Sequence, residues 1–294
     1  MPKDTTRTEQ QYSAATPYKL KGFRYLMGYH ARVCKLIFDK PNNESSKYIY
    51  IDLNCGAGYQ PDYGEVGDET LGSPIIALQE LNGQGIEPIC HFCDANKESL
   101  EILKRTIEEL KLNCEPHYWL GDNKNSLINI SQDLADSKFH GLVYSDPNGK
   151  QDFPIREIKD VFQLPQMRKV DLLMNVATTY VKRWESNPKA NWEVYSLEEI
   201  ITGHGKEKIF VRKPENPSLK WTFIYATNWA KQKDLIKIQL YSVDGDIGKG
   251  ILDHLFNPRS NPLPGIYNDG SVSIQTTLNF DMPNSDLEER ETES

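Results

Sequence analysis

The sequence predicts an α/β fold with a doubly wound, mostly parallel sheet and a C-terminal elaboration. Between residues 48 and 176, short apolar segments alternate with longer segments of helical periodicity. Strands that alternate with helices are typical of a parallel sheet with helices on both faces. The run at 48–53 is apolar except for Asp52 and leads directly into a turn with two glycines. Such a run predicts a central strand that is buried on both faces.

Each element is predicted from local signals in chain order. Residues 1–16 are polar, and apolar residues at three- and four-residue steps then predict a helix over 23–38. Ser73 followed by Pro74 predicts the start of a further helix, with Ser73 as its cap. Up to residue 176, the expected strands are 48–53, 86–93, 117–120, 140–144 and 170–176, and the helices between them are 73–81, 97–112, 126–135 and 154–162. Beyond residue 176 the pattern is looser, with expected helices at 198–201 and 250–256 and expected strands at 209–212, 221–227 and 236–243.

The composition is that of an ordinary soluble protein, with 38% hydrophobic and 26% charged residues. No apolar stretch reaches the roughly 18 residues that a membrane span needs, and the polar N-terminus is not a secretory signal. An odd count of five cysteines without disulfide spacing indicates a reducing, cytoplasmic compartment. Cys90 and Cys93 are spaced like a metal pair, but on a strand they would face opposite sides, so we expect no metal site.

The charge is unevenly distributed along the chain. A formal net charge of -8 argues against a uniformly basic nucleic-acid binder. The segment Tyr18–Lys40, however, carries six basic residues and one acidic residue, and the segment 206–220 is also rich in lysine and arginine. Local basic patches can steer a protein toward a phosphate backbone. A solvated surface is the alternative interpretation of the same pattern.

The strand and glycine turn at 48–58 fit two classes of ligand, dinucleotides and S-adenosylmethionine. A dinucleotide turn requires a third small residue where a helix begins, and this position is Pro61. The next acid at a strand end, Asp94, also lies further on than the usual spacing of roughly 20 residues. Both features favour S-adenosylmethionine, and a NAD-dependent oxidoreductase is the least favoured alternative.

Aspartates follow four of the predicted strands, at Asp52, Asp94, Asp122 and Asp146. Ligands of open α/β sheets bind at the carboxyl ends of the strands, so these side chains are candidates for one crevice. Asp94 suits the ribose hydroxyls, Asp122 suits the adenine amino group, and Asp52 suits the glycine turn or the ligand's ammonium group. The alternative for each aspartate is the cap of the next helix. The expected cofactor-binding set is Asp52, Asn54, Gly56, Gly58, Ser73, Asp94, Ala95, Asp122 and Asn123.

This layout over residues 48–180 resembles the class I S-adenosylmethionine-dependent methyltransferases, which implies a Rossmann-like sheet. The run 71–78, Leu-Gly-Ser-Pro-Ile-Ile-Ala-Leu, resembles the three-Cys-motif partner protein family and is similar to ribosomal-RNA adenine-N6 methyltransferases. The run 221–228 also resembles the partner family. We expect an N-terminal tail and basic helix at 1–47, a methyltransferase domain at 48–256, and a turn-rich loop with an acidic tail at 257–294.

The predicted fourth strand ends in Asp146-Pro147-Asn148-Gly149. Methyltransferases of amino groups carry an acid or amide, two prolines and an aromatic residue at this point. The resemblance implies that the acid and the next carbonyl accept hydrogen bonds from the target amino group. Asn148 replaces the second proline and Gly149 replaces the aromatic residue, so a ring would have to come from Tyr144, Phe153 or Tyr180. A simple turn is the alternative interpretation.

Further polar residues are expected near the same rim of the sheet. We expect Tyr180, Lys182 and Arg183 to contact the substrate, together with Asp146, Pro147 and Asn148 as the catalytic group. His30 and Lys35 in the first helix are candidate cofactor contacts, and packing or surface roles are equally compatible with their positions.

Together these features predict an S-adenosylmethionine-dependent methyltransferase of the cytoplasm. The expected methyl acceptor is an exocyclic amino group of a base in DNA or RNA, with adenine N6 as the first choice. One alternative is a methyltransferase that acts on a small molecule or a protein. Another is a non-catalytic, S-adenosylmethionine-binding subunit of a complex with a protein partner.

Overall fold

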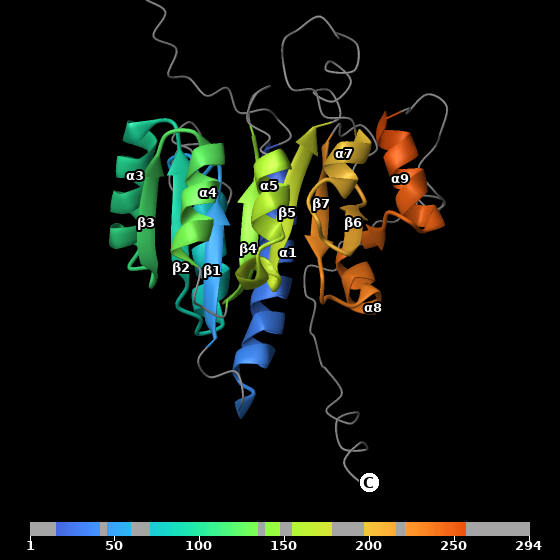
Figure 1. Ribbon diagram of the computed structural model, residues 1–294. Helices are drawn as coiled ribbons and strands as arrows, with labels where there is room; N and C mark the ends of the chain where they lie inside the picture. Colours follow the sequence, from blue (N-terminus) through green and yellow to red (C-terminus); the bar gives the residue numbers. More distant parts are fainter. Residues whose placement is uncertain are drawn as a thin grey trace, which may run out of the picture.

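The computed structural model describes residues 16–41, 46–59, 71–134, 139–147, 155–177, 197–215 and 221–256. These residues form an eight-stranded sheet in the order β3-β2-β1-β4-β5-β7-β6-β8 (Figure 1). The strands are β1 Lys47–Asp52, β2 Ile89–Asp94, β3 Glu115–Leu120, β4 Phe139–Ser145, β5 Val170–Ala177, β6 Lys208–Arg212, β7 Trp221–Thr227 and β8 Leu240–Ser242.

The strand order reverses between β1 and β4. Strands β1 to β5 pair in parallel, whereas β7 runs antiparallel to β5 and to β6, and β8 runs antiparallel to β6. The predicted fold class is therefore confirmed as an α/β fold with a doubly wound, mixed and mostly parallel sheet. In such sheets the ligand crevice lies at the carboxyl ends of the strands beside the reversal.

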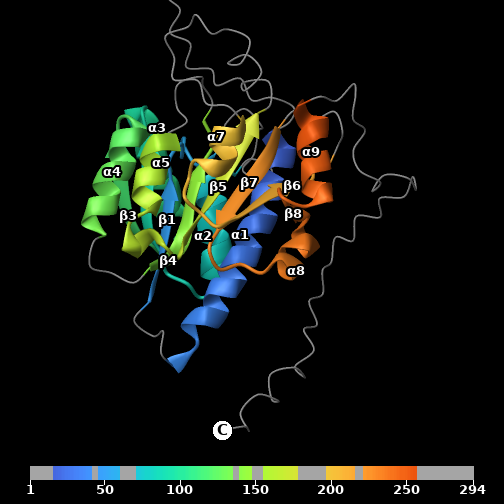
Figure 2. The same cartoon turned by 45° about the vertical axis from the view of Figure 1, so that its right-hand side comes forward.

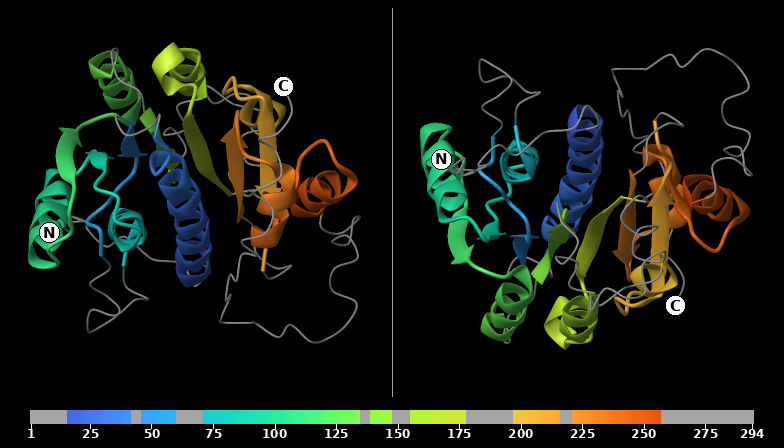
Figure 3. Two further views of the ribbon diagram at one scale, coloured as in Figure 1. Left: turned by 90° about the horizontal axis from the view of Figure 1, so that it is seen from below. Right: turned by 90° about the horizontal axis from the view of Figure 1, so that it is seen from above.

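Helices cover both faces of the sheet. The helices are α1 Thr16–Phe38, α2 Ser73–Gly83, α3 Lys97–Glu109, α4 Asn123–Asp133, α5 Ile155–Phe162, α7 Leu197–Thr202, α8 Gln232–Leu235 and α9 Asp246–Phe256, with the 3-10 turns η4 Pro165–Met167 and η5 Ile236–Ile238. Helices α1, α2 and α3 share one core with the sheet, and α4, α5 and α7 share the core on the opposite face (Figure 3). Among the described residues, no helix combines the length and apolar character that crossing a membrane requires.

Strand β1 contributes buried side chains to both cores. Tyr48 and Tyr50 belong to the core under α1 and α2, whereas Ile49 and Ile51 belong to the core under α4 and α5. All four side chains are at most 1% exposed, as the prediction of a strand buried on both faces requires.

Several local predictions differ from the structure, and three of the differences have a clear physical reason. Helix α1 begins at Thr16 rather than residue 23, because Pro17 fits the first turn of a helix, where no N–H bond is lost. The segment 236–243 is not one strand, because Gln239 is left-handed with φ 61° and separates η5 from β8. Residue Gly72, not Ser73, caps α2, and the Ser73 hydroxyl bonds to Asp52 instead.

Candidate active site

Asp52 at the end of β1 is the centre of a buried hydrogen-bond cluster. Its Oδ2 accepts hydrogen bonds from Tyr50 OH at 2.8 Å and from Ser73 Oγ at 2.7 Å. Its Oδ1 accepts the backbone N–H of Asn54 at 3.2 Å. The carboxyl group therefore ties the start of the glycine turn to the first turn of α2.

Burial changes the acidity of this group. Complete burial raises the pKa of Asp52, the three hydrogen bonds partly lower it, and the nearby Asp146 carboxylate raises it, which gives a pKa of about 7. The physical reason is that a carboxylate loses its hydration in the interior, so the neutral form is favoured. Asp52 therefore titrates near neutral pH.

The glycine turn that follows β1 has one packed glycine and one glycine that faces open space. Gly56 and Gly58 have φ of 58° and 75°, a conformation that other residues rarely adopt. A Cβ on Gly58 would overlap Leu103 Cδ1 of α3, whereas a Cβ on Gly56 would meet no atom of the described residues within 4 Å. Gly58 is therefore required for packing, and Gly56 leaves room beside the backbone for a ligand.

Asp94 at the end of β2 holds this turn in place. Its Oδ2 accepts the N–H of Gly56 at 2.9 Å, and its Oδ1 accepts the N–H of Asn96 at 2.7 Å. Asn96 in turn caps α3, and Ala95 between them is exposed. Because each carboxylate oxygen has about two acceptor positions, Asp94 retains capacity for two hydroxyl donors of a ligand.

Asp122 after β3 is the cap of α4. Its Oδ1 accepts the N–H of Lys124 at 2.7 Å, while the side chain remains exposed and Asn123 beside it is buried. The helix-cap interpretation therefore holds for Asp122. The N–H of Gly121 bonds to the carbonyl of Asp94 at 3.0 Å, so the ends of β2 and β3 lie side by side.

Asp146 after β4 is held by three polar neighbours from different elements. Its Oδ2 accepts Lys19 Nζ of α1 at 2.6 Å, and its Oδ1 accepts Asn175 Nδ2 of β5 at 2.7 Å. Its backbone N–H donates to Asn54 Oδ1 in the glycine turn at 3.2 Å. The structure thus brings Asp52, Asn54 and Asp146 together at the strand-order reversal.

Two of these contacts were not predicted from the sequence. Lys19 belongs to a basic helix, and no local pattern connects it with a residue 127 positions away. The role of Asn54 as an acceptor for Asp146 follows only from the parallel register of β1 and β4.

Several predicted site residues cannot be placed. Pro147 lies directly after Asp146 at the end of β4, whereas Asn148, Tyr180, Lys182 and Arg183 lie outside the described residues, as does Phe153. Tyr144 is fully buried, with its ring centroid 4.4 Å from that of Phe23 and the Asp146 carboxylate near its hydroxyl.

His30 has a packing role rather than a cofactor role. His30 Nε2 lies 3.2 Å from Asp171 Oδ2, and His30 Nδ1 lies 2.8 Å from Tyr48 OH. Tyr225 OH donates a very short hydrogen bond to the same Asp171 oxygen, and all of these side chains are buried. Burial lowers the pKa of His30, but the Cys34 sulfur and the bonded Asp171 outweigh this and raise it to about 10.

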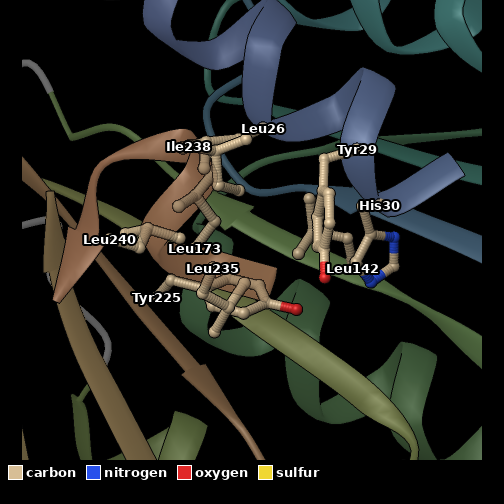
Figure 4. A pocket seen from close by; sticks show the side chains of 9 residues that line it. All are labelled: Leu26, Tyr29, His30, Leu142, Leu173, Tyr225, Leu235, Ile238 and Leu240. Carbon is tan, nitrogen blue, oxygen red and sulfur yellow. The ribbon is translucent and has the colours of Figure 1, made fainter. Parts of the chain in front are cut away.

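A small cavity adjoins this buried cluster. Tyr29 and His30 of α1 and Tyr225 of β7 line it, together with leucines from the sheet (Figure 4).

The other candidate cofactor contact in this helix, Lys35, forms an exposed ion pair with Asp39 at 2.8 Å. Neither His30 nor Lys35 is therefore directed to the rim where Asp146 lies.

Comparisons with known proteins add likenesses at low identity. The sequence matches no family model and no curated protein. A methyltransferase from Geobacter sulfurreducens is 10% identical with a TM-score of 0.36, and the alignment covers 67% of this chain and 77% of that one. A predicted N6-adenine-specific DNA methylase from Listeria monocytogenes is 13% identical with a TM-score of 0.38, and the alignment covers 76% of this chain and 53% of that one. An rRNA methylase from Streptococcus thermophilus is 8% identical with a TM-score of 0.37, and the alignment covers 63% of this chain and 88% of that one.

These likenesses are to methyltransferase structures, and they do not extend to substrate or subfamily. In the described part of the chain, no group of three or more histidine, cysteine or acidic side chains is arranged to hold a metal ion. The polar side chains at the carboxyl ends of β1, β2 and β4 are aspartates and an amide, with Lys19 of α1 and Asn175 of β5 beside them.

Proposed function

We propose that this protein is an S-adenosylmethionine-dependent methyltransferase that acts on an exocyclic amino group of a nucleic-acid base, with adenine N6 as the first choice. One observation carries the proposal: the hydrogen bond between Asp146 N and Asn54 Oδ1, at 3.2 Å. It joins the turn suited to the cofactor to the residue suited to the methyl acceptor. Group transfer requires this closeness, because the two reactants must meet within a few ångströms.

The residues after β1 and β2 fit S-adenosylmethionine. Gly56 leaves open space beside the turn, and Asp94 retains acceptor positions for a pair of ribose hydroxyls. Asp52, Asn54, Ser73 and Gly58 would support the turn from below, and Ala95, Asp122 and Asn123 would flank the adenine. When bound, S-adenosylmethionine supplies an electrophilic methyl group on a sulfonium.

Asp146 is suited to orient an amino group. Lys19 and Asn175 fix its carboxylate from two sides, and the remaining acceptor positions can take an N–H of the acceptor. Pro147 has no N–H, so it presents no competing donor beside the site. An acceptor nitrogen held through its N–H has its lone pair directed away from Asp146 and toward the cofactor.

The remaining site residues belong to the proposal without a described geometry. Asn148 would complete the catalytic group with Asp146 and Pro147. Tyr180, Lys182 and Arg183 would contact the base or its phosphates. The likeness of the run 71–78 to the three-Cys-motif partner family and to adenine-N6 methyltransferases supports the choice of a base as the acceptor, and a protein partner is a further proposal.

A transfer assay tests this function. The purified protein is incubated with S-adenosylmethionine labelled in the methyl group and with single-stranded or double-stranded DNA or RNA. We expect label in at least one nucleic acid, and we expect Asp146→Ala to abolish transfer while the dissociation constant for the cofactor stays within about twofold. The matched control is Asp253→Ala on the exposed side of α9, which should transfer like the wild type.

One observation favours a second candidate, a non-catalytic subunit that binds S-adenosylmethionine. Both carboxylate oxygens of Asp146 already accept protein donors. Cofactor binding measured by calorimetry, without transfer to any nucleic acid, small molecule or protein, would support this second candidate over the first.

A further inference from the structure

Lys19 places a primary amine of this chain on the carboxylate that is suited to orient a methyl acceptor. Its Nζ donates to Asp146 Oδ2 at 2.6 Å, and both side chains are largely buried. An ammonium group has three N–H donors and no acceptor, so it presents N–H groups to a carboxylate as a substrate amine does. Lys19 therefore makes the contact with Asp146 that is proposed for the substrate.

The packing of α1 on β4 fixes this contact. Phe23 lies one turn after Lys19 on the same face of the helix, and its ring centroid lies 4.4 Å from that of Tyr144. Tyr144 lies two residues before Asp146, and alternate residues of a strand share a face. Helix α1 lies obliquely across the sheet, with its amino-terminal end at the edge to which the β5 arrow points (Figure 2). Two parallel contacts, Phe23 with Tyr144 and Lys19 with Asp146, thus join α1 to the end of β4.

Helix α1 also lies close to the sheet between these two contacts. A Cβ on Gly22 would overlap Arg212 Nη1 of β6 and would lie 3.1 Å from Phe223 Cε2 of β7. Arg212 is itself buried, and its Nη2 donates to Glu215 at 3.0 Å. The turn of α1 that follows Lys19 is therefore held against the sheet, which limits the reach of the Lys19 side chain.

Asp146 also contacts the turn that is suited to the cofactor. Its backbone N–H donates to Asn54 Oδ1 at 3.2 Å, and Gly56 in the same turn leaves open space among the described residues. Asp146 thus touches the glycine turn through its backbone and the Lys19 amine through its side chain. Group transfer requires this closeness of donor and acceptor.

We propose that Lys19 is a methylation site of this protein, modified in cis with S-adenosylmethionine as the methyl donor, an inference that rests on the function proposed above. The Lys19 ammonium group first gives a proton to the Asp146 carboxylate, which frees the nitrogen lone pair. The nitrogen then bonds to the methyl carbon as the bond from that carbon to the sulfonium breaks, and the bonding pair stays on the sulfur of S-adenosylhomocysteine. The proton passes from Asp146 to water.

Methylation is compatible with the ion pair of Lys19 and Asp146. A methylated lysine keeps its positive charge. Because the ammonium group has three N–H groups, at least one remains after one or two transfers, and the hydrogen bond to Asp146 Oδ2 persists. A third methyl group would remove the last donor, so we expect the modification to stop at one or two methyl groups.

The buried lysine Lys206 provides an internal comparison. Burial lowers its pKa to about 8, so more of its amine is neutral and nucleophilic near neutral pH. Its Nζ, however, donates to the Met167 carbonyl at 2.9 Å, and Lys206 precedes β6 at the edge of the sheet where β7 ends and β5 begins. This edge is opposite to that of Asp146. Reactivity alone would select Lys206, whereas position selects Lys19.

Peptide mapping by mass spectrometry tests the inference. The purified full-length protein is incubated with S-adenosylmethionine that carries a deuterated methyl group and is then digested. We expect one or two deuterated methyl groups on Lys19 and none on Lys206. Lys19→Arg should remove the label, whereas Lys35→Arg, the matched control on the same helix, should be labelled on Lys19 like the wild type. A rate constant of labelling that rises with protein concentration would overturn transfer in cis.

Protection by the product of transfer is a second measurement, which does not depend on activity. We expect S-adenosylhomocysteine at about ten times its dissociation constant to slow acetylation of Lys19 by acetic anhydride roughly tenfold, because only the unoccupied protein reacts. Acetylation of Lys35 in the same sample should be unchanged. Equal rates at Lys19 with and without S-adenosylhomocysteine would overturn the inference.

The outcomes separate this inference from the proposed function. Transfer to an oligonucleotide, with Lys19 left unmodified, would overturn the inference and leave the function intact. Deuterated methyl groups on Lys19, without transfer to any nucleic acid, would support the inference and contradict a nucleic-acid acceptor. Cofactor binding without transfer to either would contradict both. The thermal unfolding midpoint, measured for both variants, shows that a loss of label is not a loss of fold.

Discussion

Lys19 Nζ lies 2.6 Å from Asp146 Oδ2, and the two side chains are only 16% and 14% exposed. This ion pair joins the first turns of α1 to the end of β4. Because Asn175 holds the other carboxylate oxygen, the orientation of Asp146 is determined from both sides.

Replacing Lys19 tests whether it positions Asp146. We expect Lys19→Ala to lower kcat of methyl transfer roughly 10- to 100-fold, because a displacement near 1 Å at a catalytic group has an effect of that order. Cofactor affinity should be unchanged, and Lys19→Arg should recover part of the activity. Lys35→Ala, which removes an exposed ion pair of the same helix, is the control. A faster Lys19→Ala enzyme would show instead that Lys19 blocks the acceptor position.

The raised pKa of Asp52 predicts a specific dependence of stability on pH. The pKa is about 7 in the folded protein and about 3.9 in an unfolded chain, so the folded protein binds this proton more tightly. The contribution is complete below pH ~3.9 and is lost as the pH rises through about 7. We expect the free energy of unfolding of the wild type, relative to Asp52→Asn, to fall by up to a few kcal/mol across this window. Urea unfolding of both proteins from pH 4.5 to 8 measures the difference, and parallel curves would contradict the assignment.

The buried pair of His30 and Asp171 should be costly to break on one side only. We expect His30→Ala to lower the free energy of unfolding by about 3–5 kcal/mol, because Asp171 is left as a buried charge without its partner. The double variant His30→Leu/Asp171→Leu should lose less stability than the sum of the losses of the single variants His30→Leu and Asp171→Leu. Since the pKa of His30 is raised to about 10, the contribution of His30 is complete below pH ~6.5 and is lost as the pH rises through about 10. Urea titrations at pH 7 and pH 9.5 check both statements.

The two glycines of the turn should respond differently to alanine. In Gly56→Ala the one cost is that alanine must adopt the left-handed backbone conformation of Gly56, so we expect a loss of about 1–2 kcal/mol of stability. Its new methyl group would fill the space proposed for the cofactor, so binding of S-adenosylmethionine should fall at least tenfold. Gly58→Ala also overlaps Leu103, and its stability should fall further than that of Gly56→Ala. Thermal unfolding and calorimetry, run on both variants, distinguish the packing glycine from the ligand-facing one.

The sequence predicts β1, β2, β4 and β5 well, because each is a compact and largely apolar run, and β1, β2 and β4 end in or just before an aspartate. Strands β1, β2, β4 and β5 begin or end within a few residues of their expected positions. The opposite orientation of Cys90 and Cys93 is also confirmed, since they belong to different cores. Local periodicity is sufficient for these features.

The contacts that complete the site could not be predicted in the same way. The pairing of Lys19 with Asp146 and that of His30 with Asp171 join residues 127 and 141 positions apart, and each depends on how α1 crosses the sheet. No local pattern encodes that crossing. The helix cap formed by Asp122 is one of the two roles that the sequence allows, and only the geometry of its bond to Lys124 N–H shows it.

The strand order has a consequence for folding during synthesis on the ribosome. Strand β1 has β2 on one edge and β4 on the other, so a nascent chain that ends at residue 134 has synthesised only one of its two neighbours. Its bare edge belongs to a strand that is buried on both faces in the folded protein, and exposed apolar edges of this kind pair with other chains. The central strand is therefore vulnerable to aggregation until residues 139–145 have emerged, and a fragment that ends before them should be insoluble.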